Sequence, residues 1–209
     1  MESNPVDPLA DIADYYSGKL AEHGPSPRGV DWNGAESQQL RFEQLRRVLQ
    51  EPADFSLHDL GCGYGAFCDF LETHCRNFQY HGHDISPAMI EAAKRRRGSK
   101  TYATFSVGGR PGNPADYAVA SGIFNVRLRR TDEWCRRYVA ATLETLHHSS
   151  RRGFAFNCLT SYSDPERMRD YLYYADPGAL FDLCKRRYST QVALLHDYGL
   201  YEFTIIVRK

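Results

Sequence analysis

The sequence predicts an α/β protein with three layers, in which a mostly parallel seven-stranded sheet lies between two layers of helices. Strand and helix signals alternate along most of the chain, which is typical of a parallel sheet covered on both faces. Three glycines, Gly61, Gly63 and Gly65, directly follow the first strand signal. The last two strand signals are too close together for a parallel crossover, so we expect them to form a C-terminal antiparallel hairpin.

Apolar stripes and capping residues indicate the helices. In the segment 36–50, Leu40, Leu45 and Leu49 recur at helical spacing. Ser86 and Pro87 form an N-cap and first-turn pair. The predicted helices cover residues 11–23, 36–50, 66–75 and 88–97, another begins at Thr131, and Asp164-Pro165 and Asp176-Pro177 each announce one more.

Seven short apolar runs, rich in β-branched and aromatic residues, indicate the strands. They cover residues 54–60, 78–85, 101–107, 116–124, 153–160, 191–198 and 201–208. In open parallel sheets, ligands bind outside the carboxyl ends of the strands. The glycine-rich loop after residue 60 lies at such an end, so we expect it to face a ligand.

Composition narrows the class of protein. The chain has 209 residues, of which 42% are hydrophobic and 25% charged, and this is typical of one soluble globular domain. The formal net charge is zero, so it gives no argument for nucleic acid or membrane partners. The basic run at 94–97 ends a predicted helix, where cations are favourable, and we prefer this interpretation to a nucleic-acid patch.

The six cysteines show no C-x-x-C spacing, so neither a zinc ribbon nor a thioredoxin-type motif is indicated. The first residues lack a basic region followed by an apolar run, and no apolar stretch approaches the roughly 20 residues of a membrane span. We therefore expect a cytoplasmic protein with free thiols, either a monomer or a homodimer.

Three ligands are compatible in principle with a glycine-rich loop after a strand. A phosphate-binding P-loop needs Lys-Ser or Lys-Thr after its last glycine, and neither follows Gly65. A dinucleotide fingerprint needs G-x-G-x-x-G, and here the third glycine comes one residue early, although Ala66 stands at a position that sometimes accepts alanine. An NAD(P)-dependent oxidoreductase therefore remains an alternative.

The sequence DLGCGYG at 59–65 resembles the first motif of class I S-adenosylmethionine (SAM)-dependent methyltransferases, acid-x-Gly-x-Gly-x-Gly. An acidic residue, Asp84, ends the second strand and is suited to holding the two ribose hydroxyls of an adenosine ligand. The resemblance covers roughly residues 36–209 and includes the terminal hairpin. It implies a Rossmann-like fold, SAM as cofactor, a single catalytic domain at 36–209, and residues 1–35 as an N-terminal extension or lid.

The resemblance also implies roles for individual residues. The three glycines let the backbone approach the methionine portion of the cofactor. Asp59 orients the loop or accepts from the cofactor's ammonium, and Asp84 holds the ribose. The implied cofactor-binding residues are Trp32, Arg41, Asp59, Gly61, Cys62, Gly63, Gly65, His83, Asp84, Ile85, Ser121 and Gly122.

Two of these residues precede the first strand. Trp32 is suited to packing on a bound ligand, and Arg41 to pairing with the cofactor's carboxylate. The alternative is an ordinary amphipathic helix with an exposed Arg41. The chain departs from the family after the third strand, where Gly108 and Gly109 stand in place of the acid that contacts adenine in many members.

Acceptor-side residues are expected in the segments after the fourth and later strands. A cluster of tyrosines there offers stacking area with a polar tip, and the alternative is that the rings pack the helices onto the sheet. His196 is the candidate general base, because an imidazole titrates near neutrality. The candidate substrate-binding residues are Asn125, Tyr162, Tyr174 and Tyr198.

His81 and His83 share one face of a predicted strand, beside Asp84. We interpret them as a packed strand end and expect no metal. The chain lacks the Asn- or Asp-Pro-Pro-aromatic motif of many nucleic-acid base methyltransferases, so we expect a small-molecule acceptor with an O, N or C nucleophile. The arginines of 125–130 hint at an anionic substrate or form a solvated strip. A non-catalytic SAM-binding protein is a further alternative.

Overall fold

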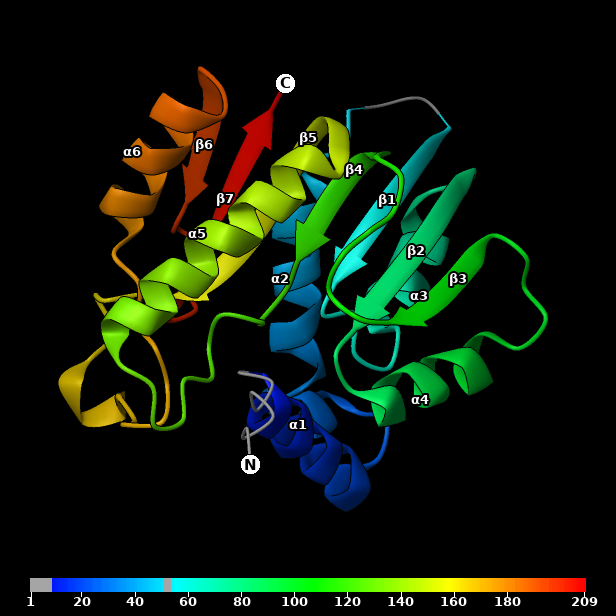
Figure 1. Ribbon diagram of the computed structural model, residues 1–209, viewed down its shortest axis with the longest axis horizontal. Coiled ribbons are helices and arrows are strands. Elements are labelled where there is room, and N and C mark those ends of the chain that lie inside the picture. The colour runs from blue at the N-terminus through cyan, green and yellow to red at the C-terminus, as the bar shows by residue number, and fades with distance from the viewer. Residues whose placement is uncertain (1–8, 51–53) are drawn as a thin grey trace, which may run out of the picture.

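The computed structural model describes residues 9–50 and 54–209, which form a seven-stranded sheet with helices on both faces (Figure 1). The strand order is β3-β2-β1-β4-β5-β7-β6. Strands β1 to β5 pair in parallel, and β7 pairs antiparallel with both β5 and β6. The predicted fold class, with its C-terminal antiparallel hairpin, is confirmed.

The elements follow one another almost as the sequence predicts. The strands are β1 Phe55–Leu60, β2 Phe78–Asp84, β3 Ala103–Val107, β4 Ala115–Ala120, β5 Ser150–Leu159, β6 Gln191–Leu195 and β7 Glu202–Arg208. The α-helices are α1 Ala10–His23, α2 Ala35–Arg46, α3 Ala66–His74, α4 Pro87–Arg97, α5 Asp132–His148 and α6 Pro177–Arg187. Two single turns of 3-10 helix, Pro27–Val30 and Pro165–Arg167, complete the list.

Capping side chains fix the beginnings of helices. The Ser86 hydroxyl accepts from the Met89 N–H at 3.2 Å and starts α4. The Thr131 hydroxyl accepts from the Trp134 N–H at 3.2 Å and starts α5. Each side chain satisfies one of the backbone donors that a helix N-terminus leaves free.

The prediction of a helix at Asp164-Pro165 is wrong, because only the single 3-10 turn Pro165–Arg167 forms there. The Asp164 carboxylate does not cap it and accepts from the Tyr201 hydroxyl instead. At the similar Asp176-Pro177 pair, the Asp176 carboxylate accepts from the Ala179 N–H at 3.0 Å, and α6 forms as expected.

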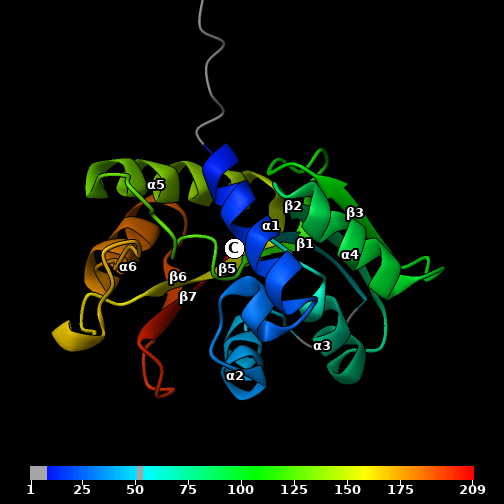
Figure 2. The ribbon, with the colours of Figure 1, turned by 90° about the horizontal axis from the view of Figure 1, so that it is seen from below.

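The two faces of the sheet carry different helices. α2, α3 and α4 contribute to one apolar core, around Phe42, Phe67 and Ile90. α5 and α6 contribute to the other, with Leu143 and Cys184. Figure 2 shows α1 lying across the carboxyl ends of the central strands, between α5 and α4. The edge at which ligands bind in such folds is therefore covered by the N-terminal segment.

The seven residues 108–114 that connect β3 to β4 form no helix. This linker passes across the face of β1 and β2 that α5 leaves uncovered (Figure 1). A hydrogen bond of 2.8 Å between His58 Nε2 and the Asn113 carbonyl holds it against β1.

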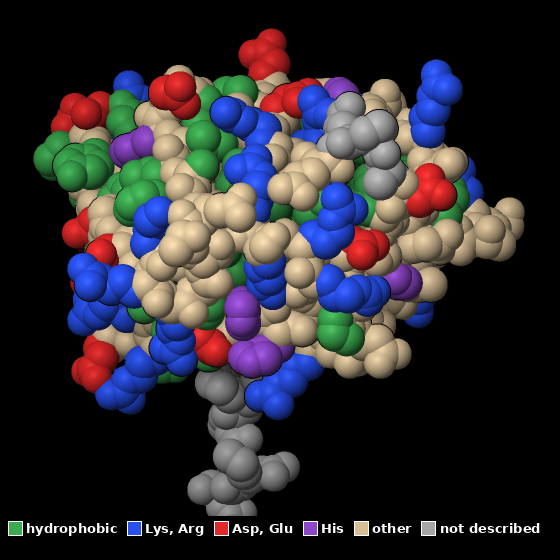
Figure 3. Space-filling view, turned by 90° about the horizontal axis from the view of Figure 1, so that it is seen from above, with side chains coloured by type: hydrophobic (Ala, Val, Ile, Leu, Met, Phe, Trp, Pro, Cys, Tyr) green, Lys and Arg blue, Asp and Glu red, His purple; other side chains and the backbone are tan. Residues whose placement is uncertain are grey.

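Both signs of charge occur over the amino-end face of the sheet (Figure 3). In the basic run that ends α4, Arg96 pairs with Asp69, and Arg97 pairs with Asp69 and with Glu72. These pairs favour the helix-end interpretation of that run. No α-helix in the ranges 9–50 and 54–209 combines the length and the hydropathy needed to cross a membrane.

Candidate active site

The glycine-rich loop connects the end of β1 to α3. Gly61, Gly63 and Gly65 have φ angles of +75°, +53° and +85°, in the left-handed region that favours glycine. A β-carbon on Gly61 would lie 2.0 Å from Cγ2 of Ile123, so no larger residue fits. The N–H of Gly61 donates to the His83 carbonyl at 2.7 Å, which ties the loop to the end of β2.

Asp84, the last residue of β2, faces this loop. One of its oxygens accepts from the Gly63 N–H at 2.9 Å and the other from the Ser86 N–H at 2.8 Å. The side chain is buried, and burial raises its pKa while the two backbone donors lower it, with a net rise. Each carboxylate oxygen retains a lone pair for a further donor.

Asp59 is buried beneath the loop and has one unsatisfied oxygen. Its Oδ2 accepts from the Tyr80 hydroxyl, whereas Oδ1 finds no partner among the described residues. Burial, together with the nearby charge of Asp84, raises the pKa of Asp59 to about 7, although the Tyr80 hydroxyl opposes this rise. Native proteins rarely leave a buried carboxylate oxygen without a donor, so this oxygen has acceptor capacity that the described residues do not use.

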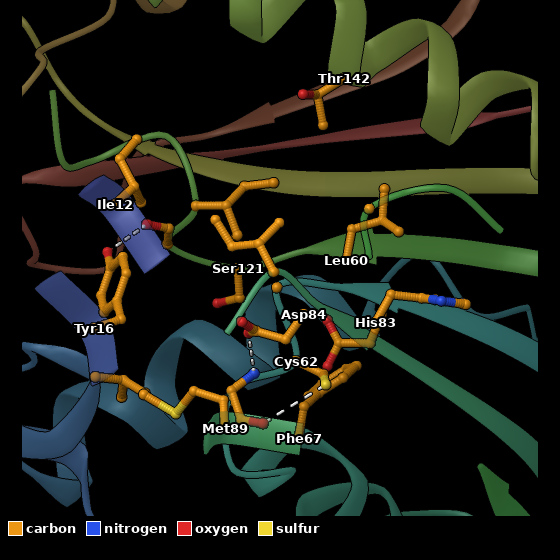
Figure 4. Close-up of a pocket in the computed structure, with 18 of the residues that line it drawn as sticks. Ile12, Tyr16, Leu60, Cys62, Phe67, His83, Asp84, Met89, Ser121 and Thr142 are labelled. Atoms are coloured by element: carbon orange, nitrogen blue, oxygen red, sulfur yellow. Dashed lines mark hydrogen bonds between the residues drawn. The ribbon is translucent and has the colours of Figure 1, made fainter. Parts of the chain in front are cut away.

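These groups lie around a cavity of about 650 Å³ at the carboxyl edge of the sheet. In Figure 4, Ile12 and Tyr16 of α1 lie on one side, Thr142 of α5 lies above, and Ser121 and Asp84 lie below. Ten of the twelve predicted cofactor-binding residues line the cavity: Trp32, Asp59, Gly61, Cys62, Gly63, His83, Asp84, Ile85, Ser121 and Gly122. Sequence reasoning therefore brings together most of this surface, and Gly65 instead begins α3 behind it.

Arg41 requires a correction. It does not line the cavity, and its Nε and Nη2 donate to the two carboxylate oxygens of Glu202 on β7, at 2.7 and 2.6 Å. The structure therefore places Arg41 neither beside a cofactor carboxylate nor on an exposed helix face. Its side chain is buried in an ion pair with Glu202. The guanidinium also lies 4.8 Å from the ring centroid of Trp32, so Arg41 supports a cavity residue from behind.

Trp32 and α1 form the wall opposite the loop. The Trp32 indole packs so closely on Gly122 that a β-carbon there would lie 3.1 Å from it. The Tyr16 hydroxyl donates to the Gly122 carbonyl at 3.5 Å. Ile12 is the buried residue of α1 and points into the cavity (Figure 4). The N-terminal extension thus lies where a lid would lie.

The sequence analysis missed two groups of lining residues. Ile12 and Tyr16 are four positions apart on α1, and Tyr138, Thr142 and Thr145 share one face of α5. Both sets follow helical spacing, which places them on one side of a helix. The helical spacing of these residues is visible in the sequence. It does not show, however, whether they pack in the core or line a cavity.

The expected acceptor-side residues need correction, because none of them lines the cavity. His196 follows β6, three strands beyond β4 in the sheet order, which corresponds to about 14 Å at the usual strand spacing. Its ring is exposed and lies 6.0 Å from that of Tyr162. His196 is therefore too remote to serve as the base for a substrate in this cavity.

The other three expected residues have structural contacts. The Asn125 side-chain oxygen accepts from the Leu159 N–H at 3.3 Å. The Tyr174 hydroxyl accepts from the Arg169 N–H at 2.9 Å. The Tyr198 hydroxyl pairs with Thr204, at 3.1 Å. Asn125 and Tyr198 thus bond to β5 and β7, whereas Tyr174 bonds within its own loop. The alternative, that the tyrosine rings pack the helices onto the sheet, stays a prediction.

His83 lines the cavity and belongs to a chain of hydrogen bonds. Its Nε2 lies 3.0 Å from Nδ1 of His58, and its Nδ1 lies 2.9 Å from the Ser106 hydroxyl. Burial, and the neighbouring His58 and His81 rings, lower the pKa of His83 to about 4, so the ring is neutral at pH 7. Within the described ranges, no group of three or more His, Cys, Asp or Glu is arranged to hold a metal ion.

The fold and the site together define a Rossmann-like α/β protein with a nucleoside-type cavity. A family model described as "Methyltransferase domain" matches residues 58–151. The chain is 59% identical over 164 residues to "Putative methyltransferase Rv1506c" of Mycobacterium tuberculosis, and the alignment covers 78% of this chain and 98% of that protein. The chain therefore belongs to the methyltransferase family.

Solved structures show the same fold. The magnesium protoporphyrin IX methyltransferase ChlM from Synechocystis PCC 6803, with bound SAM, has a TM-score of 0.68 at 14% identity and covers 99% of this chain and 100% of its own. The DhpI complex with the demethylated product S-adenosylhomocysteine (SAH) has a TM-score of 0.65 at 12% identity, with 95% of each chain covered. These matches and the family membership confirm the predicted fold and enzyme class, and they replace the oxidoreductase alternative.

Proposed function

We propose that the chain binds SAM in the cavity beneath α1 and transfers the methyl group to a small-molecule acceptor. The observation that carries the proposal is the unsatisfied Oδ1 of Asp59, a buried carboxylate oxygen of a residue that lines a cavity beside the glycine-rich loop. An amino acid ammonium would supply the missing donor.

The other groups around the cavity also fit the cofactor. The glycine loop lets the backbone come close to the ligand at a place where a side chain would collide. Asp84 retains acceptor capacity for ribose hydroxyls after its two backbone bonds. Gly108 and Gly109 line the cavity where many family members have an acid, so adenine would meet main-chain groups there.

The cofactor, when bound, supplies an electrophilic methyl on sulfonium sulfur: the acceptor's lone pair forms the new bond to carbon, and the carbon–sulfur electron pair remains on sulfur. This chain's own contribution is to align the reactants and exclude water. Holding two reactants in line is worth about 7–11 kcal/mol in well-oriented systems. α1 covers the cavity with Ile12 and Tyr16 facing in, which serves both tasks.

A small acceptor fits the enclosure better than a polymer. The volume of about 650 Å³ lies within the usual range for small-molecule sites, and it must be shared with the cofactor. The segment that covers the site comes from the chain itself. A nucleic-acid strand or a protein would need that cover to be displaced.

Calorimetric titration of the protein with SAM, SAH and NAD tests the binding step. We expect SAM and SAH to bind and NAD not to bind. Asp84→Ala should abolish binding of both sulfur compounds, whereas the exposed Asp182→Ala on α6 should leave their affinity unchanged. Binding of NAD alone, or full affinity for SAH in Asp84→Ala, would contradict the proposed cofactor site.

Methyl transfer needs a separate test, because a non-catalytic SAM-binding protein would also pass the titration. The protein is incubated with methyl-labelled SAM and a small-molecule extract, and labelled products are detected by mass spectrometry. We expect a labelled product with wild type and none with Asp84→Ala. SAM binding without any labelled product across extracts would favour the non-catalytic alternative.

A further inference from the structure

We propose that the acceptor is an uncharged, largely apolar small molecule, which binds in the part of the cavity between α1 and α5. This inference rests on the proposed function and adds the substrate class to it.

The cavity has two chemically different parts. The glycine loop, Asp59 and Asp84 make the part at the ends of β1 and β2 polar. The part between the two helices is formed by Leu9, Ile12, Tyr16, Ile123, Tyr138 and Ala141, with the two threonines Thr142 and Thr145 of α5. Hydrocarbon and aromatic rings dominate this second part, so it gains free energy by burying apolar surface and not by pairing charges.

The charged groups of the cavity come from elements other than α1 and α5. Asp59, His83 and Asp84 belong to β1 and β2, and Arg110 belongs to the linker before β4. A charged acceptor between α1 and α5 would lose its hydration, and the described residues of these two helices that line the cavity offer it no opposite charge. Burying an unpaired charge is strongly unfavourable, so such a molecule is selected against.

The arginines after β4 do not change this conclusion. The sequence suggested them as anchors for an anionic substrate, but they do not line the cavity. Arg127 donates to the Asp170 carbonyl at 2.8 Å and pairs with Asp132. Arg130 pairs with Asp11 at the beginning of α1. Its role is to hold the covering helix over the cavity.

Hydroxyl groups are the polar side-chain atoms that α1 and α5 contribute to this part, from Tyr16 on α1 and from Tyr138, Thr142 and Thr145 on α5. Burial raises the pKa of Tyr16, and it raises the pKa of Tyr138 to about 12, so both hydroxyls keep their protons at neutral pH. The charge of Asp84 raises the pKa of both hydroxyls further. The Tyr16 hydroxyl already donates its proton to the Gly122 carbonyl, so the Tyr138 hydroxyl is the one that suits a substrate with a neutral oxygen or nitrogen.

Apart from the Tyr16 bond to the Gly122 carbonyl, the polar contacts that dock α1 come from residues that do not line the cavity. The Tyr15 hydroxyl donates to Asp31 at 2.6 Å, Lys19 pairs with the same carboxylate at 2.9 Å, and the Ser17 and Ser86 hydroxyls lie 2.8 Å apart. These contacts dock the helix, while Ile12 faces inward and is 5% exposed. Ile12 can therefore be changed without removing one of these docking bonds. Such a change tests the apolar part of the cavity between α1 and α5, which we call the chamber.

The test uses two fluorescent probes with the same ring system. N-phenyl-1-naphthylamine is neutral, and 8-anilino-1-naphthalenesulfonate carries a sulfonate. Each is titrated into protein loaded with SAH. We expect the neutral probe to bind at least about tenfold more tightly than the sulfonate, because only the sulfonate must be desolvated without a partner. Equal or tighter binding of the sulfonate would overturn the proposal.

Two variants of α1 test whether the neutral probe binds in the part of the cavity between α1 and α5. Ile12→Asp places a carboxylate in this part of the cavity and should weaken the neutral probe at least about tenfold, a larger factor than its effect on SAH affinity. Ala21→Asp, at an exposed position of the same helix, should change neither value. Full affinity for the neutral probe in Ile12→Asp would contradict the proposed chamber. If the SAH-loaded wild type binds no neutral probe, this inference fails alone, whereas failure of SAH itself to bind overturns the proposed function.

Discussion

Asp59 should release a proton when the cofactor binds. In the free protein its carboxyl is buried, one oxygen has no donor among the described residues, and its pKa is raised to about 7. Under the proposed function, the cofactor's ammonium would lie against that oxygen. An opposite charge at such a distance lowers a carboxyl pKa by about 1–3 units. Binding therefore favours the ionised carboxylate, and affinity should rise with pH on the acidic side of pH 7.

The size of the proton release follows from these pKa values. At pH 6, about nine molecules in ten carry the Asp59 proton in the free state, and about one in ten does so if the bound pKa is about 5. Binding then releases about 0.8 proton at pH 6 and about 0.1 at pH 8, where the free carboxyl is already ionised.

The assay is calorimetric titration of SAH in two buffers with different ionisation enthalpies, at pH 6 and at pH 8. The dependence of the observed enthalpy on the buffer enthalpy gives the number of protons released. Asp59→Asn should abolish the release at pH 6, and Asp182→Asn should not. Equal release at both pH values, or unchanged release in Asp59→Asn, would refute the assigned role of this carboxyl.

Three further outcomes are expected. Arg41→Ala should lower the free energy of unfolding, measured by urea denaturation, by about 3–5 kcal/mol because Glu202 is left buried without its partner. The double change Arg41→Met with Glu202→Leu should recover most of that loss, and a double variant no more stable than the single one would contradict the explanation. Gly61→Ala should weaken SAH binding in calorimetry at least about tenfold, since it has φ > 0 and no room for a β-carbon, whereas Gly112→Ala, in open space, should not. His83 has a folded pKa of about 4 against about 6.5 when unfolded, so it contributes stability above pH 6.5 that is lost as pH falls toward 4. The full loss is on the order of 3 kcal/mol. In His83→Asn, the free energy of unfolding should therefore differ less between pH 7 and pH 4.5 than it does in wild type. If the free energy of unfolding of both proteins changes equally with pH, His83 is not the cause.

Local chemistry made much of the site predictable. A glycine with φ > 0 and a serine N-cap are determined by neighbours in sequence, so the loop at 61–65 and the start of α4 at Ser86 could be predicted. The position of Asp84 followed from the end of the second strand. These three features alone place the polar part of the cavity.

Contacts between residues far apart in the sequence were harder to predict. Arg41 pairs with Glu202, which is 161 residues away, and no local pattern indicates that contact. His196 does follow a strand whose carboxyl end lies at the expected edge, but the sheet order puts β7 between β5 and β6. Alternating strand and helix signals give the order along the chain, and the lateral position of a terminal hairpin is a separate choice. This explains why the sequence placed His196 beside the acceptor when the structure places it beyond β7.

The linker at 108–114 explains both the histidines of β2 and the apolar chamber. A strand covered by helices on both faces reads as a nearly continuous apolar run, and β2 carries His81 and His83 because no helix covers that side of it. For neutral rings, only one arrangement satisfies the bonds: His58 Nε2 donates to the Asn113 carbonyl, His83 Nε2 donates to His58 Nδ1, and Ser106 donates to His83 Nδ1. The lone pairs of His58 and His83 are thereby both in use, which leaves neither ring a nitrogen for a metal ion. The same missing helix leaves one face of α5 without a neighbour at its side, so residues spaced as if for a core line a cavity instead.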